Sequence, residues 1–424
     1  MRPQERDGLR RIILCVVLIM FGCASISQAQ FQVLYNFGSY PSDGSFPGNT
    51  PVLDGTGNIY GTTTQGGTQN NGGIVFELSN SGGTWNETTL YSFCTPPTCP
   101  SGAGPVGLVL DSSGNIFGMT TYGGVQPCPS SGVFEGCGVA FELSAPSARG
   151  GAWTYTVLYT FCSVGELCED GANPLGPLVL DKLGNLYGTT SSGGTNDAGV
   201  VFELSHDQNG WTQNILYSFC SAGGDICSDG AEPEWGVTFD NSGNLFGTTS
   251  RGGDGGVLYK LSLSSGDWTE TVVNNFPPPE PGGSNSPGPV SVDALGNLYT
   301  TLTHFPNHEG FSNGLVGRLN TSGDARVFRF NGTNGKGPFT GVIVDASRRA
   351  LYGTTLLSPF GPGNVFRIDK LGQETVLYTF CQQKQNCADG NYPSGLAEDK
   401  FGSLYGTTEY GGINGSGIVF EITP

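Results

Sequence analysis

One pattern of four short β-type runs recurs seven times along this chain, and it limits the fold more than any other feature. In the third copy the runs cover residues 178–181, 185–190, 199–205 and 211–219. β-Branched and aromatic residues fill the runs, and Gly, Pro, Asn and Asp separate them, which is typical of an all-β repeat protein. The Asp that ends the first run recurs in every copy, as Asp54, Asp111, Asp181, Asp240, Asp293, Asp345 and Asp399.

Each of these aspartates begins a predicted hairpin turn. Gly follows three residues later in six of the seven copies, and Arg348 takes its place in the other. An Asp carboxylate accepts hydrogen bonds from the backbone N–H groups ahead of it, and Gly tolerates a positive φ, so this spacing predicts a tight turn. Calcium binding is the alternative role of these aspartates, although the alternating Asp series of a calcium loop is absent.

The second run carries a Gly at its centre in six copies, as in Leu-Tyr-Gly-Thr-Thr at 186–190. The fifth copy departs from this pattern, with Tyr299 followed by Thr300. A mid-strand Gly predicts the close approach of a neighbouring backbone, as where two sheets pack face to face.

The copies are offset along the chain. The seventh copy has no fourth run before Pro424, but a matching Val-Leu-Tyr-x-Phe run stands at 33–37, ahead of the first copy. Pairing that run into the last sheet would close a ring without exposed sheet edges. We therefore predict a seven-bladed β-propeller of four-stranded antiparallel blades over residues 30–424, in which the N-terminal strand closes the last blade. An open β-solenoid is the alternative, but its coils are usually much shorter than these repeats.

The motifs resemble those of a known family. Asp-x-x-Gly-Asn-Leu-Tyr-Gly-Thr-Thr, a Gly-Gly loop and Gly-Val-Val-Phe-Glu-Leu recur in this order across residues 33–424, as in the GloVer tandem repeat of secreted bacterial proteins, a group with a choice of C-terminal anchors. A looser similarity connects Asp-x-x-Gly-Asn-Leu-Tyr to NHL-type propellers and to the sensor propellers of two-component regulators. The resemblance implies an exported, propeller-like protein and no particular activity.

A targeting segment precedes the repeats. Basic residues from Arg2 to Arg11 are followed by an apolar run at 12–21 and by small residues up to Ala29. Because this run is too short to cross a bilayer, residues 1–29 are predicted to be a cleaved secretory signal peptide, and the protein to be secreted or periplasmic. Lipoprotein anchoring at Cys23 is the alternative. No second apolar segment of spanning length follows, so no membrane span is expected.

Ten cysteines follow the targeting segment, in five close pairs: Cys94 with Cys99, Cys128 with Cys137, Cys162 with Cys168, Cys220 with Cys227, and Cys381 with Cys387. An even number in tight pairs behind a secretory signal predicts disulfides. Zinc binding is disfavoured because paired Cys-x-x-Cys motifs are absent. The motif formed by His304, His308 and Glu309 lacks the helix that would place both imidazoles on one ion, so no metal site is expected there.

The charge of the chain narrows the partners. The formal net charge is −18, which disfavours nucleic acid and anionic membranes as partners. A surface this acidic suits cationic partners or divalent cations, and calcium is the one cofactor considered. The chain is expected to be a monomer.

One face of the propeller is predicted to carry the binding site. Loops between strands two and three share a face with the loops that leave strand four, and all ten cysteines fall on these loops. Binding sites commonly lie on loops that a rigid scaffold holds. A repeated Asp-Gly-x-x-Pro lies on the same loops, so the candidate ligand-binding residues are its aspartates and two neighbours: Asp43, Asp170, Asp229, Asp389, Glu232 and Trp235.

Two functions are consistent with this face. The favoured one is a non-catalytic binding or surface-interaction module for a glycan or protein ligand, in which a ring of carboxylates near the channel mouth holds a sugar or a cation. The alternative is a carbohydrate-active hydrolase or lyase that uses carboxylates at the channel mouth. No nucleophile elbow or phosphate-binding loop is present, so no catalytic residue is assigned. Turn chemistry alone is a further explanation for the Asp-Gly-x-x-Pro motif.

Overall fold

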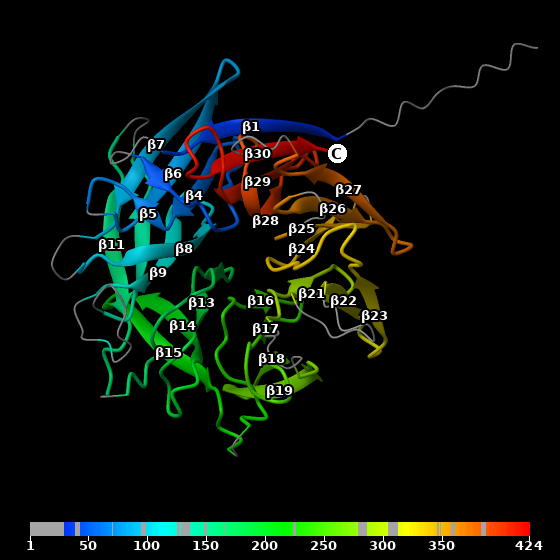
Figure 1. The fold of residues 1–424 in the computed structure, drawn as a ribbon. Coiled ribbons are helices and arrows are strands. Elements are labelled where there is room, and N and C mark those ends of the chain that lie inside the picture. Colours follow the sequence, from blue (N-terminus) through cyan, green and yellow to red (C-terminus); the bar gives the residue numbers. More distant parts are fainter. Residues whose placement is uncertain are drawn as a thin grey trace, which may run out of the picture.

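The computed structural model describes residues 29–38, 43–69, 71–94, 99–124, 128, 136–147, 151–165, 167–223, 226–278, 286–303, 313–345, 347, 349–357, 361–382 and 387–424. They form seven four-stranded antiparallel sheets arranged as blades around one axis (Figure 1). This confirms the predicted seven-bladed β-propeller. In the part of the chain that the structure describes, no helix is long and apolar enough to cross a membrane. Cys23 and nearly all of the predicted signal peptide lie outside the described residues.

Six blades use their strands in chain order from the axis outward, and the seventh adds β1 outside its last three strands. The first three blades are β3 (Val52–Leu53), β4 (Ile59–Thr63), β6 (Ile74–Ser81) and β7 (Thr84–Ser92); β8 (Ala103–Leu110), β9 (Ile116–Tyr122), β10 (Val139–Ser144) and β11 (Thr154–Thr160); and β12 (Val179–Leu180), β13 (Leu186–Thr190), β14 (Val200–Asp207) and β15 (Gly210–Ser218). A short pair, β2 (Gly44–Ser45) and β5 (Gln65–Gly66), lies beside the first blade.

The other blades follow the same order. They are β16 (Thr238–Phe239), β17 (Leu245–Thr248), β18 (Val257–Ser264) and β19 (Asp267–Asn275); β20 (Ser291–Val292), β21 (Leu298–Leu302), β22 (Leu315–Leu319) and β23 (Ala325–Arg329); β24 (Val342–Asp345), β25 (Ala350–Thr355), β26 (Asn364–Ile368) and β27 (Glu374–Thr379); and β28 (Asn391–Glu398), β29 (Leu404–Tyr410) and β30 (Ile418–Thr423) with β1 (Gln30–Asn36).

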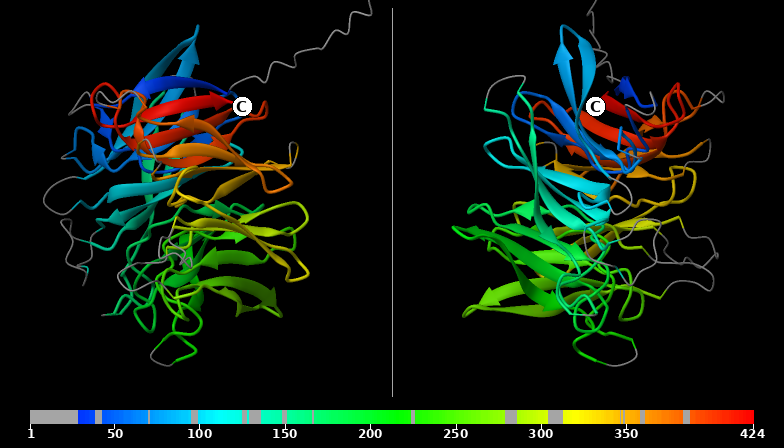
Figure 2. Two further views of the ribbon diagram at one scale, coloured as in Figure 1. Left: turned by 45° about the vertical axis from the view of Figure 1, so that its right-hand side comes forward. Right: turned by 90° about the vertical axis from the view of Figure 1, so that its left-hand side faces the viewer.

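The ring is closed by the first strand. β1 pairs antiparallel with β30, from Gln30 opposite Thr423 to Asn36 opposite Ile418, and the two lie side by side in both views of Figure 2. The ring of Phe31 stacks on that of Tyr378 in blade 6, with centroids 3.9 Å apart. The predicted closure of the last blade is therefore confirmed.

The aspartate turns form as predicted. In blade 3, Asp181 Oδ1 accepts hydrogen bonds from the backbone N–H groups of Leu183 (2.8 Å) and Asn185 (2.9 Å). Gly184 has a φ of 88°, a conformation that strains any residue with a Cβ. The Asn185 side chain adds a hydrogen bond from Nδ2 to Asp181 Oδ2, at 2.9 Å. These contacts satisfy the carboxylate locally, which supports turn formation as its role.

The mid-strand glycine has a different partner from the predicted one. A Cβ on Gly188 would lie 2.8 Å from Cζ of Phe202, a ring on the next strand of the same blade. The prediction of a neighbouring backbone was wrong, because the space is needed by an aromatic side chain. The same fit occurs between Gly61 and Phe76, Gly118 and Phe141, Gly247 and Tyr259, Gly353 and Phe366, and Gly406 and Phe420.

These aromatic rings join neighbouring blades. Phe161 ends the outer strand of blade 2, and its centroid lies 5.2 Å from that of Phe202 in blade 3. Five other pairs repeat the contact at 5.0–5.2 Å: Phe37 with Phe76, Phe93 with Phe141, Phe219 with Tyr259, Phe330 with Phe366, and Phe380 with Phe420. Blade 5 differs: Thr300 stands in place of the mid-strand glycine and Gly317 in place of the aromatic residue, and the two face each other in the sheet.

The Gly-Thr-Thr motif adds polar contacts between blades. Its first Thr donates a hydrogen bond to a backbone carbonyl that leads into the next blade, as from Thr189 Oγ1 to Trp235 O at 2.8 Å. Its second Thr donates within its own blade, as from Thr190 Oγ1 to Ser192 O at 3.0 Å. The first contact recurs from Thr248 to Gly288, Thr354 to Ser394 and Thr407 to Asn49.

We predict that Gly188→Ala lowers the free energy of unfolding by about 1–3 kcal/mol, because the added methyl group must displace the Phe202 ring from a packed core. Gly55→Ala is the matched control, since nothing lies within 4 Å of a Cβ there. Its effect should stay within about 0.5 kcal/mol. Urea unfolding of both variants measures the difference. Equal stability of Gly188→Ala and the parent protein would contradict the account of the glycine.

Candidate functional site

Disulfides fasten the loops of one face. All five predicted pairs form: Cys94–Cys99, Cys128–Cys137, Cys162–Cys168, Cys220–Cys227 and Cys381–Cys387. Four of them close loops that leave an outer strand, and Cys128–Cys137 closes the loop between β9 and β10. Five disulfides indicate an extracellular or periplasmic protein, because thiols stay reduced in the cytoplasm.

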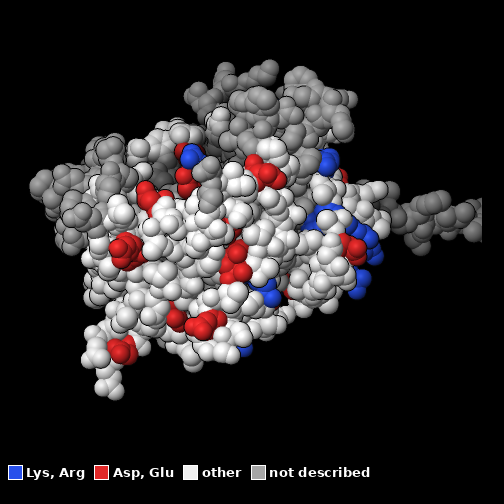
Figure 3. All heavy atoms as spheres, turned by 90° about the horizontal axis from the view of Figure 1, so that it is seen from below, with Lys and Arg blue, Asp and Glu red and all other residues white. Residues whose placement is uncertain are grey.

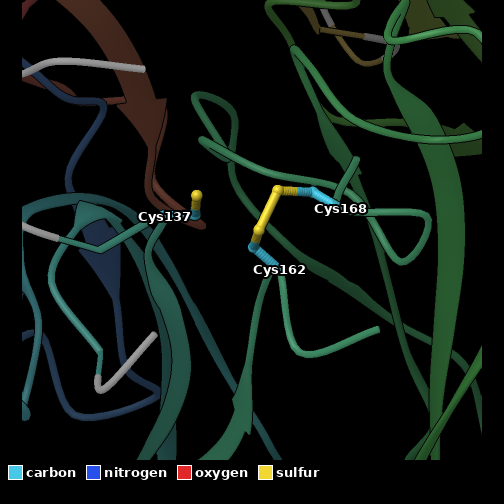
Figure 4. Close-up of side chains that lie close together, drawn as sticks. All are labelled: Cys137, Cys162 and Cys168. Carbon is cyan, nitrogen blue, oxygen red and sulfur yellow. A yellow bond between two sulfur atoms is a disulfide. The ribbon is translucent and has the colours of Figure 1, made fainter. Parts of the chain in front are cut away.

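Two of these disulfides lie next to each other. The sulfurs of Cys137, Cys162 and Cys168 are all within 4.8 Å of one another (Figure 4). Metal ions bind thiolates, whereas these sulfurs are already bonded, Cys162 to Cys168 and Cys137 to Cys128. The group therefore fastens two neighbouring loops and offers no thiolate to a metal.

The four predicted aspartates are held by hydrogen bonds within their own loops. Asp170 is 3% exposed, and its Oδ2 accepts from Tyr159 Oη (2.7 Å) and from the backbone and hydroxyl of Ser163 (both 2.8 Å). The equivalent Tyr–Asp contacts are Tyr35 with Asp43 (3.2 Å), Tyr217 with Asp229 (2.7 Å) and Tyr378 with Asp389 (2.7 Å). Each carboxylate thus joins the end of an outer strand to the loop that follows it.

The Pro of the same motif packs between blades. The Cδ of Pro233 would lie 2.7 Å from a Cβ placed on Gly199, at the start of the third strand of the preceding blade. Equivalent contacts join Gly138 to Pro174, Gly363 to Pro393 and Gly417 to Pro47. The Asp of Asp-Gly-x-x-Pro therefore fixes a loop and the Pro packs against the preceding blade. Both roles are structural, as the turn explanation of the motif predicts.

No cation site is evident among the carboxylates that the structure describes. Within the described residues, the only group of three or more candidate ligands close enough for one ion is the cysteine group above. The candidates His304, His308 and Glu309 lie outside the described residues.

Glu232 and Trp235 lie on the segment that leads into blade 4. Glu232 Oε2 forms an ion pair with Arg251 Nε at 3.0 Å. The indole of Trp235 meets the ring of Phe339 edge to face, with centroids 5.0 Å apart. Its Nε1 is buried and has no hydrogen-bond partner among the described residues. Beside it, Glu234 Oε2 accepts from Ser286 Oγ at 3.2 Å.

Phe339 is the residue that sequence reasoning missed. It leads into blade 6, and its contact with Trp235 of blade 4 passes the segment that leads into blade 5, where a Cβ on Gly288 would lie 2.8 Å from Phe339 O. The signal in the sequence was an aromatic residue after the Pro in these two copies alone, Pro233-Glu-Trp235 and Pro338-Phe339. Only the ring geometry brings the two together.

Residues of several blades line a channel cavity. A cavity of about 400 Å³ is lined by the starts of the inner strands, with hydroxyls from Thr50, Thr238, Ser291 and Thr340. No carboxylate, His or Cys is among the described residues that line it. The cavity offers small hydroxyl groups and backbone atoms. Phe339 directly precedes Thr340 of its lining, and Trp235 precedes Thr238 by three residues.

Two carboxyls whose pKa values are raised to about 7 lie on outer strands, away from the channel cavity. Burial, reinforced by the nearby Asp229 carboxylate, raises the pKa of Glu270 to about 7. Burial also raises the pKa of Glu87 to about 7, where the Thr89 hydroxyl opposes the shift and Asp43 adds to it. Both residues occupy the same register position, opposite Leu261 and Leu78. The charged neighbour in each case belongs to the loop of the preceding blade.

A family model of the Gloeobacter/Verrucomicrobia repeat matches residues 128–355 and 256–424, which together span most of the chain. The chain belongs to this repeat family. The Gloeobacter/Verrucomicrobia repeat corresponds to the resemblance seen in the motifs, and each four-stranded blade is one repeat. No curated protein matches the chain in sequence.

Solved structures resemble this Gloeobacter/Verrucomicrobia repeat protein only distantly. A candidate 6-phosphogluconolactonase of Bacteroides uniformis has 11% identity and a TM-score of 0.47, covering 77% of this chain and 83% of its own. A Lactobacillus plantarum protein has 13% identity and a TM-score of 0.49, covering 83% of this chain and 95% of its own. A candidate glucose dehydrogenase of Thermus thermophilus has 13% identity and a TM-score of 0.46, covering 93% of this chain and 100% of its own. At these values no function follows, and the fold rests on the strand pairing itself.

The raised pKa values predict how stability depends on pH. The folded protein holds protons on Glu87 and Glu270 between about pH 4.5 and 7 that the unfolded chain has released, so stability falls as pH rises through this window. Glu270→Gln and Glu87→Gln should each raise the free energy of unfolding by about 1 kcal/mol at pH 8 and change it little at pH 4.5. The value is kept small because both side chains are partly solvated. Thermal unfolding from pH 4.5 to 8 measures this.

Glu169→Gln, which removes an exposed carboxylate, is the control and should leave the pH profile unchanged. A parent profile that is flat from pH 4.5 to 8, or Gln variants that follow the parent at every pH, would contradict the assignment.

Proposed function

We propose that this repeat protein is an exported, non-catalytic binding module that holds a glycan on its disulfide-fastened face, at the mouth of the channel. Export through the signal peptide at 1–29 belongs to the proposal, and the five disulfides support it. The disulfides support a binding role, because a cross-link restricts the conformations of a loop and so reduces the entropy lost when a ligand binds.

The observation that carries the proposal is the contact of Trp235 with Phe339, which stand on the segments that lead to Thr238 and Thr340 of the channel lining. Aromatic faces bind the C–H faces of sugar rings, and polar groups beside them bind the hydroxyls. Glu232 and Glu234 stand on the same segment as Trp235, and the buried indole N–H has no partner among the described residues. A donor without an acceptor in a buried place is costly, and a ligand hydroxyl would supply the acceptor.

The hydrolase or lyase alternative has less support. Its proposed carboxylates at Asp43, Asp170, Asp229 and Asp389 already accept hydrogen bonds from tyrosines and loop backbone. The carboxyls with raised pKa values are Glu77, Glu87, Glu270 and Glu374, which lie on third and outer strands and do not line the channel cavity. Release of reducing sugar from a bound glycan would nevertheless establish catalysis.

The test is a glycan array probed with residues 30–424, with and without calcium. A glycan that binds should lose at least tenfold in affinity with Trp235→Ala or Phe339→Ala, since each removes an aromatic contact at the site. Tyr410→Ala is the matched control, because Tyr410 is 40% exposed and ends β29 toward the same face. Circular dichroism checks the fold of each variant.

Three results would contradict the proposal: binding that survives both aromatic substitutions, an array with no bound glycan, or binding by a protein ligand alone. A requirement for calcium would add a cation to the site.

A further inference from the structure

On the face opposite the disulfides, blades 1–4 each carry a tryptophan that packs toward the preceding blade, whereas the outer strands of blades 5–7 carry none. Trp153 of blade 2 meets Tyr60 of blade 1 edge to face at 6.3 Å. Trp211 of blade 3 meets Phe117 of blade 2 in the same way at 6.2 Å. Trp268 packs against the apolar cluster that contains Tyr187, and Trp85 and Tyr405 pack against a common cluster. The tryptophan in each case fills the groove between two blades.

No tryptophan fills the groove between blades 5 and 6. In blade 3 the outer hairpin extends to the pair Asp207–Gly210, and Trp211 stands opposite His206. In blade 6 the equivalent hairpin ends earlier, at the pair Ile368–Glu374, so no position corresponds to the tryptophan. Tyr299 of blade 5 is therefore left facing a groove of about 870 Å³ between the two blades. A cavity of this size is in the range that holds small organic ligands, roughly 300–1,000 Å³.

The groove is lined by basic side chains in an otherwise acidic protein. Arg318 and Arg326 stand opposite each other on β22 and β23, and Arg349 and Lys370 come from two turns of blade 6. Nine of the fourteen Lys and Arg that follow residue 29 fall between residues 260 and 370, although the chain has a net charge of −18. Figure 3 shows the largest group of Lys and Arg at the side where Figure 1 places β22 and β23.

The basic residue on β22 replaces an acidic one. At this register position blades 1, 3 and 7 carry Glu77, Glu203 and Glu421, which accept hydrogen bonds from the tyrosines of the same blades at 3.3, 2.8 and 3.2 Å. Blades 4 and 6 carry a basic residue there, Lys260 and Arg367. Blade 5 has Arg318 there, with its guanidinium 6.0 Å from the ring of Tyr299. The repeat has exchanged a carboxylate that was internally bonded for a cation.

The described part of the chain supplies these cations with no ion-pair partner. Among the described residues, Arg318, Arg326, Arg349 and Lys370 form no ion pair, and Arg318 Nε is buried without a hydrogen-bond partner. The three aspartates of the groove accept from backbone N–H groups of their own turns: Asp293 from Leu295 and Asp369 from Leu371, both at 2.9 Å, and Asp345 from Ser347 at 2.8 Å. A buried guanidinium N–H without an acceptor is costly, so an acceptor from outside the chain would be stabilised there.

We propose that the groove between blades 5 and 6 is a binding site for a small organic anion, one that carries a carboxylate, sulfate or phosphate group. The acidic group lies between Arg318 and Arg326, whose planar guanidinium groups suit two-point binding of such oxygens. The body of the ligand lies against Tyr299 and Phe328. This site is on the face opposite the proposed glycan site, and neither depends on the other.

The test is calorimetric titration of residues 30–424 at low ionic strength with four probes: a uronic-acid disaccharide, a sulfated disaccharide, a phosphorylated disaccharide and uncharged cellobiose. At least one charged probe should bind, and cellobiose should not. Arg318→Gln and Arg326→Gln should each weaken that binding about tenfold or more, and added NaCl should also weaken it. Which charged probe binds identifies the acidic group.

Lys182→Gln is the matched control, because it removes one exposed positive charge from a turn on the same face. Arg326 is itself exposed, so Arg326→Gln keeps the test valid if Arg318→Gln unfolds. Binding that persists in Trp235→Ala supports the groove as a separate site. The proposal is overturned if no charged probe binds, if cellobiose binds equally well, or if Arg326→Gln binds like the parent protein.

Discussion

The contact of one aromatic ring with a glycine inside a blade and a phenylalanine of the previous blade holds this propeller together. Phe202 lies across Gly188 and against Phe161, and five other blades repeat the arrangement. A side chain at the glycine position would displace the ring, and loss of the ring would separate two blades. The propeller closes in the same way, because Phe37, directly after β1, is the phenylalanine that contacts Phe76 of blade 1.

Most of the recurring polar residues are used by the same architecture. The turn aspartates bind their own backbone, the first Thr of Gly-Thr-Thr binds the next blade, and the aspartates of Asp-Gly-x-x-Pro bind a tyrosine and a loop. Candidate sites arise instead where the repeat departs from its pattern. Trp235 and Phe339 are aromatic residues of only two copies. Arg318 stands where blades 1, 3 and 7 carry a glutamate bonded to tyrosine, and it lines a groove that no tryptophan fills.

Sequence reasoning succeeded where a feature is local or strictly repeated. The Asp-x-x-Gly turns, the cysteine pairs and the strand at 33–37 are each readable from neighbouring residues or from the period, and the structure confirms them. It failed for the mid-strand glycine, because the partner ring lies across the sheet and not in an adjacent one. It also missed the contact of Trp235 with Phe339 and the groove at Arg318. The first depends on which copies meet across the propeller, and the second on a tryptophan that blades 1–4 carry and blades 5–7 lack.

The central claim is that the first strand of the folded domain completes the last blade. Gln30 and Thr423 face each other in the register of β1 and β30, and both are exposed. Replacing both with Cys and oxidising the monomer tests this pairing directly, with the cross-linked peptides identified by mass spectrometry. The account predicts an intramolecular disulfide between positions 30 and 423 and a raised melting temperature. Free thiols at both positions, or disulfide-linked dimers, would contradict it.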